Sequence, residues 1–84
     1  MYQIQIVPKA KRQLKAIPRQ MQTLLKDAIR ELSETPRPQG VKKLSGEDNL
    51  YRIRIRNYRV IYKIEDNILL ILIVAIGHRR DIYR

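Results

Sequence analysis

The chain has 84 residues, 44% of them hydrophobic, with 18 Lys and Arg against 8 Asp and Glu and a formal net charge of +10. This length supports one domain, residues 1–84, with a modest core, and the absence of cysteine excludes disulfides and thiolate chemistry. One histidine and no close carboxylate cluster provide no ligand set for structural zinc, so we expect neither a metal nor a cofactor.

The strongly positive charge of so small a domain predicts a polyanionic partner, with nucleic acid first. A membrane surface is the rival partner, but no segment combines a cationic helix face with bulky aromatic anchors. The longest apolar run, the nine residues Ile68 to Ile76, is too short to cross a bilayer as a helix. Met1 is followed by no signal-peptide pattern, so we expect the cytoplasm.

The first part of the chain predicts a strand followed by a helical hairpin. Tyr2, Ile4 and Ile6 alternate with glutamines, which is the period of a strand. Pro8 ends this strand and can open a helix, and Pro18 separates that helix from the next one. Along the second helix an apolar stripe has helical spacing: Met21, Leu24, Leu25, Ala28, Ile29 and Leu32. Residues 8–33 therefore present one apolar side.

A loop, a short strand and a turn follow the helices. The two prolines and the glycine of residues 35–40, TPRPQG, predict the loop. We expect a short strand at residues 41–44 and a turn at residues 45–49.

Residues 50–63, LYRIRIRNYRVIYK, contain five cations and no acid. Tyr51, Ile53 and Ile55 alternate with arginines, the apolar face resumes from Tyr58 onward, and Asn57 provides turn chemistry between them. The pattern predicts a β-hairpin with one face in the core and a cationic outer face carrying Arg52, Arg54, Arg56 and Arg59. The alternative is a solvated edge hairpin whose cations discourage aggregation. The absence of an acid favours an anion-binding face.

The end of the chain predicts a turn at residues 65–67, a central strand at Ile68 to Ile76 covered on both faces, and a cationic tail at Gly77 to Arg84. The order of elements predicts a two-layer α+β domain, in which the N-terminal strand and the helical hairpin pack on a small, mainly antiparallel sheet. The other face of the sheet stays partly open. There we expect a concave site with arginines and a partly apolar floor, able to stack bases or receive a partner helix.

Several segments together resemble the RelE/ParE superfamily of toxins from toxin–antitoxin systems. They are the proline-rich loop leading to KKLSG, the block YRIRIRNYRVIYKI, the apolar last strand and the ending GHRRDIYR. The resemblance covers nearly the whole chain and is closer to the RelE branch, whose members cleave mRNA in the ribosomal A site. They use no metal, and the nucleophile is the ribose 2′-OH, which attacks the adjacent phosphate. The resemblance implies a RelE-like fold, the ribosome and mRNA as partners, and a hetero-oligomer with an acidic, partly disordered antitoxin.

Two sets of site residues follow from the resemblance. The catalytic set is Arg52, Arg54, Arg59, His78, Arg79 and Tyr83. The set for RNA or ribosome binding is Lys42, Lys43, Arg56, Lys63 and Arg80. The best-known RelE pattern has lysines at the positions of Arg52 and Arg54, and arginine is a poor general base because it stays protonated. We therefore expect the arginines to orient the phosphate and stabilise the transition state, and Tyr83 or His78 to transfer protons.

Alternatives remain at both levels. The protein as a whole is alternatively a ParE-like toxin that inhibits gyrase, or a catalytically silent RNA-binding relative. Among the residues, Arg59 alternatively pairs with Glu65 or Asp66. Tyr83 alternatively packs its ring on the sheet edge, and His78 is alternatively a loop histidine without a proton-transfer role.

Overall fold

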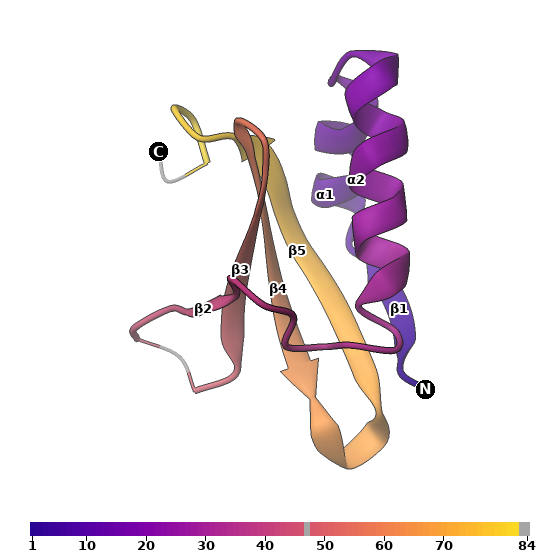
Figure 1. The fold of residues 1–84 in the computed structure, drawn as a ribbon, viewed down its shortest axis with the longest axis vertical. Coiled ribbons are helices and arrows are strands. Elements are labelled where there is room, and N and C mark those ends of the chain that lie inside the picture. The colour runs from indigo at the N-terminus through magenta and orange to yellow at the C-terminus, as the bar shows by residue number, and fades with distance from the viewer. Residues whose placement is uncertain (47, 83–84) are drawn as a thin grey trace.

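A computed structural model describes residues 1–46 and 48–82, and in this part of the chain two helices lie on one face of a five-stranded sheet (Figure 1). The strands are β1 (Gln3–Ile6), β2 (Lys42–Lys43), β3 (Leu50–Ile55), β4 (Tyr58–Glu65) and β5 (Leu70–His78). The helices are α1 (Pro8–Lys15) and α2 (Arg19–Glu31), and a 3₁₀ turn, η1 (Asp66–Ile68), joins β4 to β5. The predicted α+β class is confirmed.

The strands lie in the order β1-β5-β4-β3-β2. β1 runs parallel to β5, whereas the other neighbouring strands are antiparallel. The first strand in sequence therefore pairs with the last, and β5 lies inside the sheet between β1 and β4. Among the described residues, none of the helices is long and apolar enough to span a bilayer.

Prolines set the starts of both helices. Pro8 is the first residue of α1, where its missing N–H has no partner to lose, and Pro18 is the N-cap of α2. The predicted stripe of α2 is buried at Leu25, Ile29 and Leu32, but Leu24 is 38% exposed. Leu24 therefore lies at the margin of the stripe and not in the core.

The core lies between the helices and the sheet. Its large, fully buried side chains include Tyr62, Leu25, Leu32, Ile71 and Ile73. Tyr51, Ile53 and Val60 complete the sheet side of this core, which confirms the apolar face predicted for the hairpin.

The last strand differs from its prediction in its bounds and in its burial. It begins at Leu70, because Leu69 adopts a left-handed φ of 51° and Ile68 lies in the 3₁₀ turn, 68% exposed. It continues through Gly77 and His78, which were assigned to the tail. Its burial alternates, with Ile71, Ile73 and Ile76 buried and the residues between them only partly covered. The strand is covered on one face only in the described structure, because the helices lie on that face alone.

A β-bulge explains how this alternation continues. Tyr62 lies opposite Ile73 and Ile61 opposite Ala75, so Val74 is an extra residue on β5. The bulge moves Ile76 to the core face and Gly77 to the other face.

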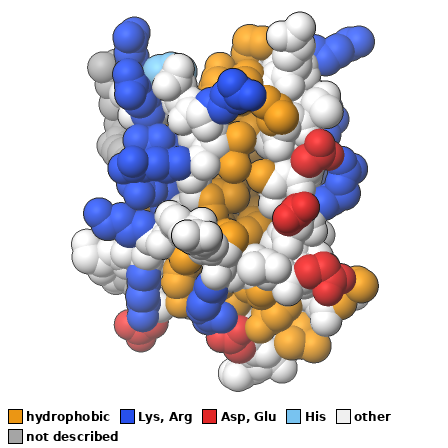
Figure 2. Space-filling view, viewed as in Figure 1, with side chains coloured by type: hydrophobic (Ala, Val, Ile, Leu, Met, Phe, Trp, Pro, Cys, Tyr) orange, Lys and Arg blue, Asp and Glu red, His pale blue; other side chains and the backbone are white. Residues whose placement is uncertain are grey.

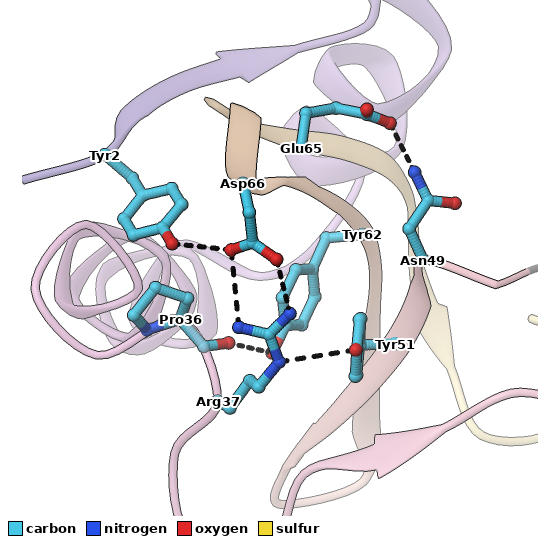
Figure 3. Close-up of polar contacts among 8 residues, drawn as sticks. All are labelled: Tyr2, Pro36, Arg37, Asn49, Tyr51, Tyr62, Glu65 and Asp66. Carbon is cyan, nitrogen blue, oxygen red and sulfur yellow. Dashed lines mark hydrogen bonds and ion pairs between the residues drawn. The ribbon is translucent and has the colours of Figure 1, made fainter. Parts of the chain in front are cut away.

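A polar cluster ties the proline-rich loop to one end of the sheet (Figure 3). Arg37 Nη2 donates to Asp66 Oδ2 at 2.9 Å, Arg37 Nε donates to the Tyr51 hydroxyl at 3.3 Å, and the Tyr2 hydroxyl donates to Asp66 Oδ1 at 2.6 Å. We call these four residues the Arg37 clasp. The hydrogen bonds from Arg37 and Tyr2 lower the pKa of Asp66. Next to the clasp, the Tyr62 hydroxyl donates to the Pro36 carbonyl at 2.8 Å, and burial raises the pKa of Tyr62.

Candidate nucleic-acid interface

The strand register collects cations on the face of the sheet away from the helices. Arg54 lies opposite Arg59, and Arg52 lies opposite both Lys42 and Ile61. Directly opposed residues of antiparallel strands project to the same face, and the core residues Tyr51 and Ile53 occupy the other face. We call the following set the arginine face: Lys42, Arg52, Arg54, Arg59 and Lys63.

Arg52 is buried, whereas the alternative of a solvated edge hairpin would leave its side chain in water. It is only 9% exposed, whereas Arg54, two residues later, is exposed. Its Nε has no hydrogen-bond partner among the described residues. Ile61, its cross-strand neighbour, is 8% exposed and provides apolar surroundings on the same face. A buried, incompletely paired guanidinium is costly, and a phosphate oxygen is the kind of acceptor that would complete it.

The hairpin turn carries Arg56, which was expected to continue the strand alternation. Arg56 lies beyond the end of β3 with a left-handed φ of 57° and an exposed side chain. Backbone conformations of this kind are uncommon for residues with a side chain. The backbone of this turn also holds the C-terminal segment, because Arg79 N donates to Asn57 O at 2.8 Å.

His78 lies on the other face of the sheet from the arginines. It is opposite Tyr58, and the two rings meet edge to face with centroids 5.4 Å apart. Tyr58 packs against the core, so the histidine is on the helix side, while Arg59 and Gly77 point the other way. His78 Nδ1 accepts a hydrogen bond from Arg80 N at 3.2 Å. In a neutral ring the proton is then on Nε2, which makes this histidine a donor.

The remaining predicted residues are distributed around these two faces. Lys43 lies opposite Tyr51, on the helix side of the sheet, and its side chain is exposed. Arg79 and Arg80 are exposed in a turn that follows β5, closed by hydrogen bonds from Asp81 N and Ile82 N to His78 O at 2.9 and 3.1 Å. Tyr83 lies outside the described residues.

Sequence reasoning missed Arg37, which was treated only as part of the loop. The feature of the sequence that could have identified Arg37 is its position between Pro36 and Pro38, because these prolines stiffen the backbone on both sides of it. Asp66, considered as a partner for Arg59, accepts hydrogen bonds from Arg37 and Tyr2.

A groove of about 860 Å³ lies between α2 and β3. Its apolar lining includes Ala28, Leu32, Ile53 and Ile55, visible in Figure 2 as a hydrophobic band between cations on the sheet side and acids on the helix side. Asp27 and Glu31 provide the acidic rim, and Lys42 and Arg54 the basic rim. We call this the α2–β3 groove. The sequence predicted a concave site on the open face, whereas this groove lies beside β3, between the two layers.

Chemically, the arginine face can bind and polarise a phosphate. Its guanidinium groups are planar and can donate two parallel hydrogen bonds to one phosphate. In the described part of the chain, the His, Asp and Glu side chains form no group of three that could hold a metal ion.

Comparisons with known proteins agree on one superfamily. The family model described as the ParE toxin of type II toxin–antitoxin systems, parDE, matches residues 4–83. No curated protein matches the sequence significantly.

Three solved structures are similar in fold along nearly their whole length. The archaeal RelE–RelB complex from Pyrococcus horikoshii is 27% identical, with a TM-score of 0.84 over 95% of this chain and 97% of that one. The RelB–RelE antitoxin–toxin complex from Methanococcus jannaschii is 26% identical, with a TM-score of 0.76 over 93% of each chain. The toxin–antitoxin complex RelBE2 from Mycobacterium tuberculosis is 25% identical, with a TM-score of 0.82 over 93% and 98%.

Proposed function

This chain belongs to the ParE toxin family of type II toxin–antitoxin systems, and we propose that it is a ribosome-dependent endoribonuclease of the RelE kind. It cleaves mRNA in the ribosomal A site without a metal: the ribose 2′-oxygen attacks the adjacent phosphorus, the bond to the 5′-oxygen of the next nucleotide breaks, and a 2′,3′-cyclic phosphate remains. The 2′-OH gives its proton to a base, and the departing 5′-oxygen receives one. The observation that carries this proposal is the arginine face, where three arginines from two paired strands share one side of the sheet.

The chemistry fits the side chains that this face provides. Arg54 and Arg59 lie directly opposite each other, so their guanidinium groups can hold one phosphate from two sides. The negative charge of the phosphate grows as the 2′-oxygen attacks, and fixed cations stabilise that charge. The partly unsatisfied guanidinium of Arg52 gains an acceptor when the phosphate binds.

Proton transfer belongs to residues other than the arginines. Tyr83 is our choice for the base that accepts the 2′-OH proton, since a ring of arginines favours phenolate. His78 is oriented as a donor by its Nδ1 hydrogen bond, and its place on the helix side argues against direct contact with the phosphate held by Arg59. Its role is then that of a secondary donor at the sheet end.

The experiment uses translating ribosomes with and without the purified protein, with mRNA cuts mapped by primer extension. Cuts in phase with codons support the proposal. Intact mRNA under conditions that permit ribosome binding would contradict it.

A ParE-like activity is the second candidate, because the family model that matches is the ParE one. Such a toxin binds gyrase and performs no RNA chemistry. The same preparation is therefore tested for gyrase-dependent DNA breaks. Breaks without mRNA cuts support this candidate, and the absence of both supports a catalytically silent RNA-binding relative.

We also propose that an acidic antitoxin neutralises this toxin, as the similar structures are complexes with RelB. A net charge of +10 attracts an acidic segment, and the apolar lining of the α2–β3 groove accommodates the hydrophobic side of an amphipathic one. Binding there places the antitoxin beside Arg54, a rim residue that also belongs to the arginine face.

The partner proposal is tested with the product of the adjacent reading frame. Ala28→Gln fills the groove with a side chain that helices tolerate, and should weaken antitoxin binding in calorimetry by about tenfold. Thr23→Gln, at an exposed position of the same helix, is the control. If a neutralised complex leaves Arg52 and Arg59 open, masking is wrong and the antitoxin must act by excluding the toxin from the ribosome.

A further inference from the structure

Gly77 lies within β5, at a position where the backbone conformation does not require glycine. Gly40 and Gly46 adopt positive φ values of 87° and 98°, whereas Gly77 lies in regular strand. Glycine weakens a strand interior, and its usual reasons there are a bulge or the close approach of another group. The bulge of β5 is at Val74, three residues earlier, so the close approach of another group is the reason left for a glycine at position 77.

The approaching group is Ile82. A methyl group added to Gly77 would lie 3.2 Å from Ile82 Cδ1 and 3.9 Å from Ile82 Cα and Cβ. Gly77 lies opposite Arg59, so this methyl would project onto the arginine face. The side chain of Ile82 therefore occupies the space beside Arg59 that a larger residue at position 77 would fill.

The backbone of the C-terminal turn supports this packing. Asp81 N and Ile82 N both donate to His78 O, and Arg79 N donates to Asn57 O in the β3–β4 turn. The chain leaves β5, turns back within four residues and returns to the sheet at Ile82. The turn and the side-chain contact together fix where the last described residue lies relative to Arg59.

We propose that Gly77 and Ile82 form a seat that positions the C-terminal turn, residues 79–82, at the arginine face, so that Gly77 is a positioning residue for the reaction. The inference rests on the proposed ribonuclease function for its catalytic part. Small displacements of groups around a reacting centre cost large factors in rate, up to about 10²-fold for about 1 Å. A glycine that keeps this seat open therefore influences the rate without contacting the RNA.

The test is Gly77→Val, which adds a side chain that strands favour. Its Cβ would lie 3.2 Å from Ile82 Cδ1, and its two methyl groups would displace the Ile82 side chain further. We expect single-turnover mRNA cleavage to fall by about tenfold or more, with ribosome affinity nearly unchanged. The ¹⁵N heteronuclear NOE of Asp81 and Ile82 should fall as the turn is released. Gly77→Val combined with Ile82→Ala exchanges volume between the two positions and should restore much of the rate and of the NOE.

Ala75→Val is the matched control, because Ala75 lies on the same strand and face, opposite Ile61. An equal loss of rate in this control would mean that the added side chain merely obstructs RNA, which overturns the inference. A released turn with normal cleavage, or an unchanged NOE in Gly77→Val, overturns it as well. If the wild-type protein leaves mRNA intact, the proposed function fails, and the NOE measurements still decide whether the seat exists.

Discussion

Arg59 stands at the centre of the cation arrangement, with Arg54 opposite it on one side and Gly77 on the other. If it stabilises the developing phosphate charge, Arg59→Ala should slow the cleavage step by about 10²-fold or more. Arg59→Lys should recover little, because an ammonium does not replace a bidentate fork. Single-turnover cleavage and ribosome binding are measured together. Equal losses in both would make Arg59 a docking residue.

Arg52 is buried, and its Nε has no hydrogen-bond partner among residues 1–46 and 48–82. A buried charge that is incompletely paired is costly to the fold, which favours a role in function. Arg52→Met keeps much of the side-chain volume and removes the buried charge, so the free energy of unfolding should stay the same or rise by about 1 kcal/mol. Cleavage should fall in the same variant. Urea denaturation provides the first measurement, and a clear loss of stability would show that the guanidinium supports the fold.

Substitutions distinguish the roles of Tyr83 and His78 in proton transfer. Tyr83→Phe keeps the ring and removes the hydroxyl, so a general base at this position predicts a loss of about 10²–10⁴-fold in cleavage. His78→Gln should cost far less, since His78 packs on Tyr58 on the opposite face from the arginines. Rates are measured at single turnover across pH. Normal cutting by Tyr83→Phe with a large loss in His78→Gln would reverse the two roles.

At the scale of whole elements, periodicity and proline were sufficient to predict most of the fold. The alternation of the hairpin gave the correct core face, and Pro8 and Pro18 gave the helix starts. The last strand was misplaced because an unbroken apolar run carries no period, and its start depends on the left-handed Leu69. The burial of Arg52 and the packing of His78 on Tyr58 depend on contacts between strands, which a local pattern does not contain.

The loop between α2 and β2 is held by a long-range ion pair, and acid should weaken it. Hydrogen bonds from Arg37 and Tyr2 lower the pKa of Asp66 in the folded protein. A carboxyl whose pKa is lower in the folded protein than in the unfolded chain stabilises the fold at pH values above its unfolded pKa, which is about 4 for aspartate. This contribution is lost as the pH falls through the pKa of the folded protein. The melting temperature should therefore drop below about pH 4.

Two variants test whether Asp66 causes the loss of stability in acid. Asp66→Asn removes the titrating group of the Arg37 clasp and should flatten this part of the pH profile. Glu31→Gln, at an exposed position at the end of α2, should leave the profile unchanged. Parallel profiles for wild type and Asp66→Asn would show that other carboxylates cause the acid loss.

The whole molecule carries more than twice as many cations as acids, so its association with RNA should depend strongly on salt. Each phosphate contact contributes about 0.7 to the slope of log K against log salt for a single strand. Arg54→Ala should reduce the slope by about that amount without changing sequence preference. Fluorescence anisotropy with a short RNA measures both. An unchanged slope would remove Arg54 from the phosphate contacts.

The parallel pairing of β1 with β5 makes the protein's completion depend on the order of its synthesis. A nascent chain can form its helices and its hairpin early, but β1 must wait for the strand that is made last. Because β5 lies between β1 and β4, the edge of β4 is unpaired and the core beside it is uncovered until β5 has been made. Gly77, on the arginine face, belongs to that same final strand. A chain that still lacks β5 therefore also lacks the partner of β1 and one border of the arginine face, and this face is completed only when β5 has formed.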